Sequence, residues 1–133
     1  MTDKTSDARM CKIRLDLARS KEHPEGLPGT GYEFFAPLDS DHHIDVEAWK
    51  AERARCFVHK LENGVTIERG ALIHRPGGVG GATWAFDYDY EAEGDEEAGY
   101  RFGEHPFVPG EYVSIRDEDG EMHTYRISSV TPE

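Results

Sequence analysis

The sequence has few cysteines, no long apolar segment and no signal-peptide pattern. Cys11 and Cys56, the two cysteines in 133 residues, are too few and too far apart for a disulfide framework or a zinc site. No apolar run approaches the roughly 20 residues that span a bilayer, and the N-terminus is polar. These absences predict a cytoplasmic protein with reduced thiols and no contact with a membrane.

Basic residues are also scarce relative to acidic ones. Fifteen Lys and Arg residues stand against 27 Asp and Glu residues, which gives a formal net charge of −12. Without a basic stripe to neutralise phosphates, nucleic acid is a poor partner. The same field favours a basic protein surface, a cationic ligand or a divalent cation, although an acidic excess by itself also serves solubility.

The length of the chain fits one domain, which would bury about two-thirds of the surface that the unfolded chain exposes. We find no internal repeat and no linker-like segment in the sequence. The sequence therefore predicts a single domain over residues 10–133, preceded by a disordered polar stretch at residues 1–9.

Alternation of apolar and polar side chains predicts an all-β, mainly antiparallel fold. Period-two patterns cover residues 10–18, 55–61 and 84–90, which is typical of half-buried strands. Further strands are predicted at residues 32–38, 65–75, 100–108 and on both sides of residues 117–120, and residues 91–99 are predicted to form an acidic loop. About eight strands with short connections favour a barrel or a tightly curled sheet.

Turn residues and glycines refine this prediction. Asn63-Gly64 is a hairpin signal, and Asp119 and Gly120 suit the positive-φ positions of a tight turn. Gly70, in the middle of a strand, indicates a bulge or a bend of the barrel.

One short helix is predicted at residues 45–54. Asp45 is a good N-cap, and Glu47 places a carboxylate in the first turn, where the helix dipole favours it. Ile44 and Trp49 occupy the two positions of a hydrophobic staple. We expect this helix to cover one end of the barrel, with Trp49 toward the sheet.

The aromatic residues predict a filled barrel interior. They alternate with polar residues along one strand and recur on the following strands: Trp84, Phe86, Tyr88, Tyr90, Tyr100, Phe102, Tyr112 and Tyr125. Inward faces of small barrels are normally filled with side chains. The alternative is that two of the tyrosines line an open mouth and stack on a planar ligand.

Catalytic and metal-binding patterns are incomplete. The serines lack a Gly-x-Ser-x-Gly elbow, and the glycine-rich residues 77–81 lack the Lys-Ser/Thr of a phosphate loop. His74, His105 and His123 could converge with Glu104 or Asp87, but no short fixed spacing identifies them as metal ligands. The sequence therefore predicts no catalytic residue, no metal site and no cofactor.

The favoured functional interpretation is a non-enzymatic binding or interaction module. Its partner would be a basic protein surface, and its interaction face would be formed by alternating acidic residues, Asp87, Asp89, Glu91 and Glu93. A solvated strand face that prevents aggregation is the alternative explanation for the same residues.

A different interpretation rests on the C-terminal residues 107–130. Pro109, Gly110, Tyr112, Val113, Ser114 and Ile115 form a segment that resembles the flavin-binding barrel of the ferredoxin-reductase superfamily. The resemblance implies FAD or FMN as cofactor, with Tyr125 stacking on the ring and with Tyr112, His123 and Arg126 around it. His123 stands where the family has a phosphate-binding arginine, and Arg126 where it has a serine. As a whole, the chain resembles small bacterial β-barrel domains, which implies no particular activity.

Overall fold

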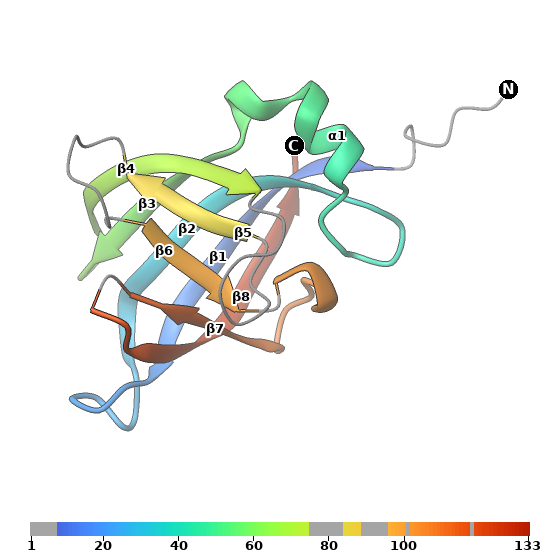
Figure 1. Cartoon of the computed structure of the whole chain (residues 1–133). Helices are drawn as coiled ribbons and strands as arrows, with labels where there is room; N and C mark the ends of the chain where they lie inside the picture. Colours follow the sequence, from blue (N-terminus) through green and yellow to red (C-terminus); the bar gives the residue numbers. More distant parts are fainter. Residues whose placement is uncertain (1–7, 75–83, 89–95, 101, 118) are drawn as a thin grey trace, which may run out of the picture.

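The computed structural model describes residues 8–74, 84–88, 96–100, 102–117 and 119–133. Within them the chain forms eight strands, each antiparallel to the next, and the last strand pairs with the first to close a barrel (Figure 1). The strands are β1 (Arg9–Arg19), β2 (Leu27–Leu38), β3 (Phe57–Glu62), β4 (Val65–His74), β5 (Trp84–Tyr88), β6 (Glu96–Tyr100), β7 (Tyr112–Arg116) and β8 (Met122–Pro132). The all-β barrel fold predicted from the sequence is confirmed.

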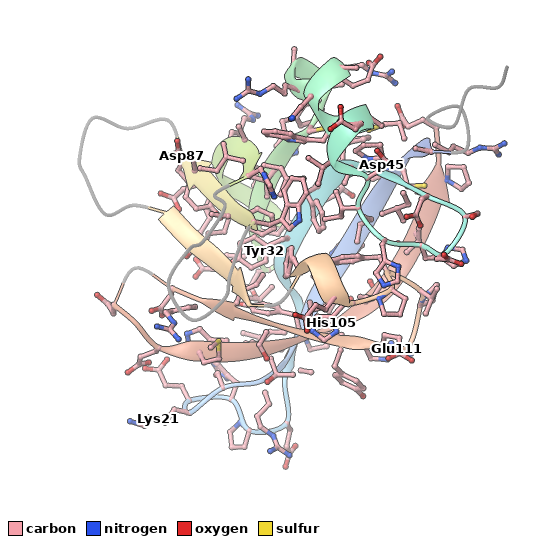
Figure 2. All side chains as sticks on the ribbon, turned by 45° about the vertical axis from the view of Figure 1, so that its right-hand side comes forward. Lys21, Tyr32, Asp45, Asp87, His105 and Glu111 are labelled. Carbon is pink, nitrogen blue, oxygen red and sulfur yellow. The ribbon has the colours of Figure 1, made fainter. Side chains whose placement is uncertain are left out.

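The two ends of the barrel differ in what covers them. The β1–β2, β3–β4 and β7–β8 connections lie at one end, which we call the hairpin end. Helix α1 (Val46–Ala51) lies at the other, the helix end, together with the first residues of β1 and the last of β8 (Figure 1). In Figure 2, Lys21 marks the hairpin end and Asp45 marks the helix end.

The barrel interior is filled by side chains from all around the sheet. The largest fully buried apolar residues include Ile13, Leu15, Phe34, Trp84, Phe86, Phe102, Phe107, Ile115 and Ile127. The predicted inward face of Trp84, Phe86 and Tyr88 is confirmed, because all three are buried. The prediction for Tyr112 is wrong: this side chain is 53% exposed, because its position on β7 points outward. Tyr90 and the side chain of Tyr100 lie outside the described part of the chain.

Helix α1 begins as predicted but ends earlier. The Asp45 side chain accepts a hydrogen bond from the Ala48 N–H at 2.9 Å. Trp49 points to the sheet, donates its indole N–H to the Leu72 carbonyl at 2.9 Å and meets Trp84 edge to face. The predicted helix continued to residue 54, whereas residues 53–55 form a 3-10 turn. The Leu72 N–H donates to the Cys56 carbonyl, so the chain must already turn toward β3 there. None of the described helices is long and apolar enough to cross a membrane.

The segment from residue 96 to residue 108 departs from the prediction in two places. The expected acidic loop contains strand β6, because pairing with β5 and β7 outweighs the low strand propensity of its glutamates. The expected strand at 100–108 contains instead a 3-10 turn at residues 102–104 followed by irregular chain. Phe102 and Phe107 are fully buried, and their rings lie 5.3 Å apart edge to face. This irregular segment thus inserts two aromatic rings into the core.

Two predictions about turns and glycines also need correction. A bulge at Gly70, one of the two predicted alternatives, is wrong, because the register shift between β3 and β4 lies at Lys60 and Leu61. A Cβ on Gly70 would stand 2.4 Å from the Asp87 carbonyl oxygen, so glycine there permits close contact between β4 and β5. Among the described residues of the β7–β8 connection, Gly120 has a positive φ of 85°, whereas Asp119 does not. The loop is longer than a two-residue turn, because the Asp117 N–H donates to the Glu121 carbonyl and closes it.

Candidate functional site

A cavity of about 260 Å³ opens at the hairpin end of the barrel. Its polar lining includes Tyr32, Lys60, Glu97, Asp117, His123 and Tyr125, and we call it the mouth cavity. Tyr32 is labelled in the interior of the barrel in Figure 2. Among the described residues, Glu97 is the one charged side chain that is fully buried, and it lies at this end of the molecule.

The floor of the mouth cavity is an ion pair with two hydroxyl donors. Glu97 is completely buried, and its Oε2 lies 2.8 Å from the Lys60 Nζ. The Tyr32 and Tyr88 hydroxyls both donate to Glu97 Oε1 at 2.7 Å. An isolated buried carboxylate would be very costly, but three donors around this one compensate for much of its lost hydration.

Strand alternation brings these residues together from distant parts of the sequence. Lys60 lies directly opposite Tyr32 in the β2–β3 register, and Glu97 lies opposite Phe86 in the β5–β6 register. Because inward positions recur every two residues, Lys60 projects inward like the buried Val58. Its ammonium also lies 5.8 Å from the centre of the Tyr88 ring.

The tyrosines around Glu97 are held in their neutral, hydrogen-donating form. Burial is the main reason why the pKa values of Tyr32 and Tyr88 lie well above the usual range, and the charge of Glu97 adds to the effect. Burial also raises the pKa of Tyr125 to about 12, although a hydrogen-bond contribution from Tyr32 opposes it. The Tyr32 and Tyr125 rings meet edge to face at 5.1 Å. The floor therefore presents fixed neutral donors beside one carboxylate.

A histidine–carboxylate pair stands beside this floor, with Asp117 in the β7–β8 connection and His123 at the start of β8. His123 Nε2 lies 2.8 Å from Asp117 Oδ2, and both side chains are only about a quarter exposed or less. Partial burial raises the pKa of Asp117, but hydrogen bonds from His123 and from the backbone N–H groups of Glu121 and Asp119 outweigh it and lower the pKa below its usual value. Asp117 is therefore an ionised acceptor that orients the imidazole.

The four ligand-binding residues predicted from the sequence are divided between the two faces of the sheet. His123 and Tyr125 line the mouth cavity, opposite Ile115 and Val113 of β7. Tyr112 and Arg126 face each other across the same two strands, and both are exposed. The structure thus brings two of the four residues together and places the other two outside.

Two of the other predicted groups, Asp87 and His74, lie in the described part of the chain and do not join this site. Asp87, which is labelled in Figure 2, lies between two buried residues of β5 and is itself partly exposed. Asp89, Glu91 and Glu93 lie outside the described residues. His74 lies at the helix end against the rings of Trp49 and Trp84, so it does not converge with His123. Burial, together with the Lys50 charge, lowers the pKa of His74.

Sequence reasoning missed the centre of the site. Glu97 lies in the segment 91–99 that the sequence predicts as an acidic loop, and the sequence analysis proposes neither Lys60 nor Tyr32 as a functional residue. One signal was present in the sequence: Lys60 follows Cys56 and Val58 at a spacing of two residues, so it lies on the same face of the strand as these apolar residues. A lysine on the inward face of a strand needs a partner of opposite charge. Nothing in the sequence alone identifies Glu97 as that partner.

A second concavity, of about 360 Å³, lies at the helix end. Its walls are mostly apolar and include Leu38, Phe107 and Val130. Arg9, Asp39 and His42 also line it, but it contains no buried ion pair among its described residues. We therefore regard the smaller mouth cavity as the better candidate site, since perturbed and buried ionisable groups are more typical of functional sites than volume alone.

The chain matches no protein-family model, no curated protein and no solved structure. The functional argument therefore rests on the geometry of the mouth cavity.

Proposed function

We propose that the protein is a small-ligand-binding barrel that holds an organic cation in the mouth cavity. The observation that carries this proposal is the Lys60–Glu97 ion pair, buried with its two tyrosine donors directly beneath a concave opening. In proteins, replacing a buried ion pair by apolar residues of similar volume is often neutral or stabilising, so stability alone does not explain such a pair. Departures of this kind from an apolar core are expected chiefly where a site has a function.

Charge around the opening favours a cation. The lining contains four carboxylates, Glu22, Glu62, Glu97 and Asp117, and a single ammonium, that of Lys60. Because Lys60 and Glu97 neutralise each other, the remaining rim is acidic. The net charge of −12 adds long-range attraction for the same class of ligand. Tyrosine rings beside the opening supply further attraction for an organic cation.

The proposal is tested by titrating the purified protein with a small diamine and with a guanidinium compound, each compared with a neutral diol of equal length. We expect saturable binding of the cations, weakened by salt, with no binding of the diol. All titrations contain a chelator, so that metal ions play no part. Equal responses to the cation and the diol would contradict the proposal.

Matched variants locate the binding. Glu62→Gln removes one rim charge, and we expect the affinity for the diamine to fall several-fold. Glu111→Gln removes another exposed carboxylate, one that does not line the cavity, and we expect it to leave the affinity unchanged. An equal effect of both variants would mean that only net charge matters.

This proposal retains the non-enzymatic binding role inferred from the sequence and moves its site to the hairpin end. A basic protein surface is a second candidate partner, because the charge of −12 favours it equally. The flavin alternative receives support only from the inward position of Tyr125 and His123. Tyr112 and Arg126 face away from them, and the acidic rim disfavours a phosphate-bearing ligand.

A further inference from the structure

The β7–β8 connection and the first residues of β8 place close together three side chains of the kind that bind metal ions. One ligand atom each from Asp117, Glu121 and His123 lies within 4.8 Å of the other two. One of these distances, His123 Nε2 to Asp117 Oδ2, is already 2.8 Å. Ligand atoms around a tetrahedral zinc ion lie roughly 3.3 Å apart, given metal–ligand bonds of about 2.0–2.2 Å. Only the exposed, flexible Glu121 side chain has to move appreciably to complete such a set.

The backbone beneath these side chains is fixed by short hydrogen bonds. Asp117 Oδ1 accepts from the N–H groups of Asp119 and Glu121, at 3.0 and 2.9 Å. The Asp117 N–H in turn donates to the Glu121 carbonyl at 2.8 Å. His123 is held in register opposite Ile115. Asp117 therefore uses one oxygen to hold the turn and leaves Oδ2 for His123 or a metal ion, which is the support that ligand residues need.

We propose that Asp117, Glu121 and His123 bind a divalent first-row transition-metal ion at the edge of the mouth cavity. An imidazole with two carboxylates suits zinc, iron or manganese better than calcium, which prefers six to eight oxygen ligands. Three protein ligands leave a coordination position open, and Asp117 and His123 both line the cavity. The bound ion would take the place of the direct contact between His123 Nε2 and Asp117 Oδ2.

This site does not depend on the proposed organic-cation site, although the two share the rim residue Asp117. Zinc is the probe, titrated into chelator-treated protein against a chromophoric competitor, and cobalt reports the coordination through its visible absorption spectrum. We expect one equivalent of zinc to bind in the micromolar range or tighter, with a weaker response to magnesium. A wild-type protein that does not compete with the dye for zinc would overturn the proposal.

Variants separate this site from adventitious surface binding. His123→Gln and Glu121→Gln should each lower the zinc affinity by at least about tenfold. His59→Gln and Glu111→Gln change the same residue types outside the cluster and should leave the affinity within about twofold of the wild type. Asp117→Asn is avoided because Asp117 also holds the turn. Unchanged affinity in His123→Gln, with folding verified by circular dichroism, would also overturn the proposal. If zinc binds as expected but the diamine does not, the organic-cation proposal alone fails.

Discussion

Lys60 and Glu97 are separated by 37 positions in the sequence, yet their charged atoms meet at 2.8 Å in the barrel interior. The two partners are buried unequally: the Lys60 side chain is 27% exposed, whereas Glu97 is fully enclosed. A buried ion pair is weak evidence for stability by itself, but removing one partner leaves the other without compensation. The difference in burial therefore predicts which of the two single substitutions lowers the unfolding free energy more.

We expect Lys60→Met to destabilise the protein more than Glu97→Gln. Lys60→Met leaves a fully buried carboxylate without its counter-ion and should cost about 3 kcal/mol of unfolding free energy. Glu97→Gln leaves an ammonium that still reaches solvent and Glu68, 3.9 Å away, and should cost about 2 kcal/mol. Urea unfolding of both variants measures the difference, and the reverse order would contradict the burial argument.

The double variant Lys60→Met/Glu97→Gln completes a thermodynamic cycle. It leaves no unpaired charge, and the glutamine oxygen still accepts from the tyrosines, so we expect a favourable coupling above about 1 kcal/mol. The surface pair Glu47–Lys50 is the control, with both side chains more than half exposed. Its cycle should give less than about 0.5 kcal/mol.

A second prediction concerns the tyrosine hydroxyls of Tyr32 and Tyr88, which donate hydrogen bonds to Glu97. Tyr32→Phe and Tyr88→Phe each remove a hydrogen bond to the charged carboxylate while keeping the ring, and each should lower the unfolding free energy by about 2 kcal/mol. Tyr112→Phe is the matched control on an exposed tyrosine and should change it by less than about 0.5 kcal/mol. If all three variants changed the unfolding free energy by the same small amount, the two hydrogen bonds to Glu97 would contribute little to stability.

The strands were predictable because their signal is local. Trp84, Phe86 and Tyr88 alternate with other residues in the sequence, and the period of two alone assigns them to one face. The end of helix α1 was less predictable, since it depends on the contact between Leu72 and Cys56, which are 16 positions apart. Local patterns thus gave the barrel, whereas element boundaries required contacts between strands.

The site was largely hidden for the same reason. Glu97 stands next to another glutamate in an acidic segment, and only pairing with both β5 and β7 turns it inward. Tyr125 and His123 were identified through the C-terminal hairpin, but Arg126 and Tyr112 belong to the opposite face by strand alternation. Applying that alternation to the predicted ligand set would have separated the two pairs.

Both thiols should be unreactive in the folded protein. Cys56 is 1% exposed and Cys11 is 6% exposed; burial raises the pKa of Cys11, and that of Cys56 to about 11. Because the thiolate is the nucleophile, Ellman's reagent at about pH 8 should react slowly with the native protein and rapidly in denaturant. Variants with a single Cys→Ser change show how fast each remaining thiol reacts with the reagent. We expect Cys56 to react more slowly than Cys11 in the native protein. Rapid stoichiometric labelling without denaturant would contradict the burial of these residues.

The last prediction is a loss of stability at alkaline pH caused by the buried tyrosines. Tyr32, Tyr88 and Tyr125 have raised pKa values in the folded state, and that of Tyr125 is about 12. An unfolded tyrosine ionises near pH 10, so above that pH the folded state holds protons that the unfolded state has released. Stability is therefore fully present below about pH 10 and decreases as the pH rises toward the folded pKa values, by up to about 1.4 kcal/mol per pH unit for each tyrosine.

The raised pKa values of the two thiols also lower the stability, and this decrease starts at a lower pH, near the ordinary cysteine pKa of about 8.5. We would therefore measure urea unfolding in a Cys11→Ser/Cys56→Ser background, in steps from neutral pH to about pH 11, while following the tyrosinate absorbance band. In this background the decrease should begin only near pH 10. Adding Tyr88→Phe should lower stability at neutral pH but make the alkaline decrease shallower, because one proton-retaining group is gone. An equally steep decrease in that variant, or full ionisation of all tyrosines before unfolding, would contradict the buried network around Glu97.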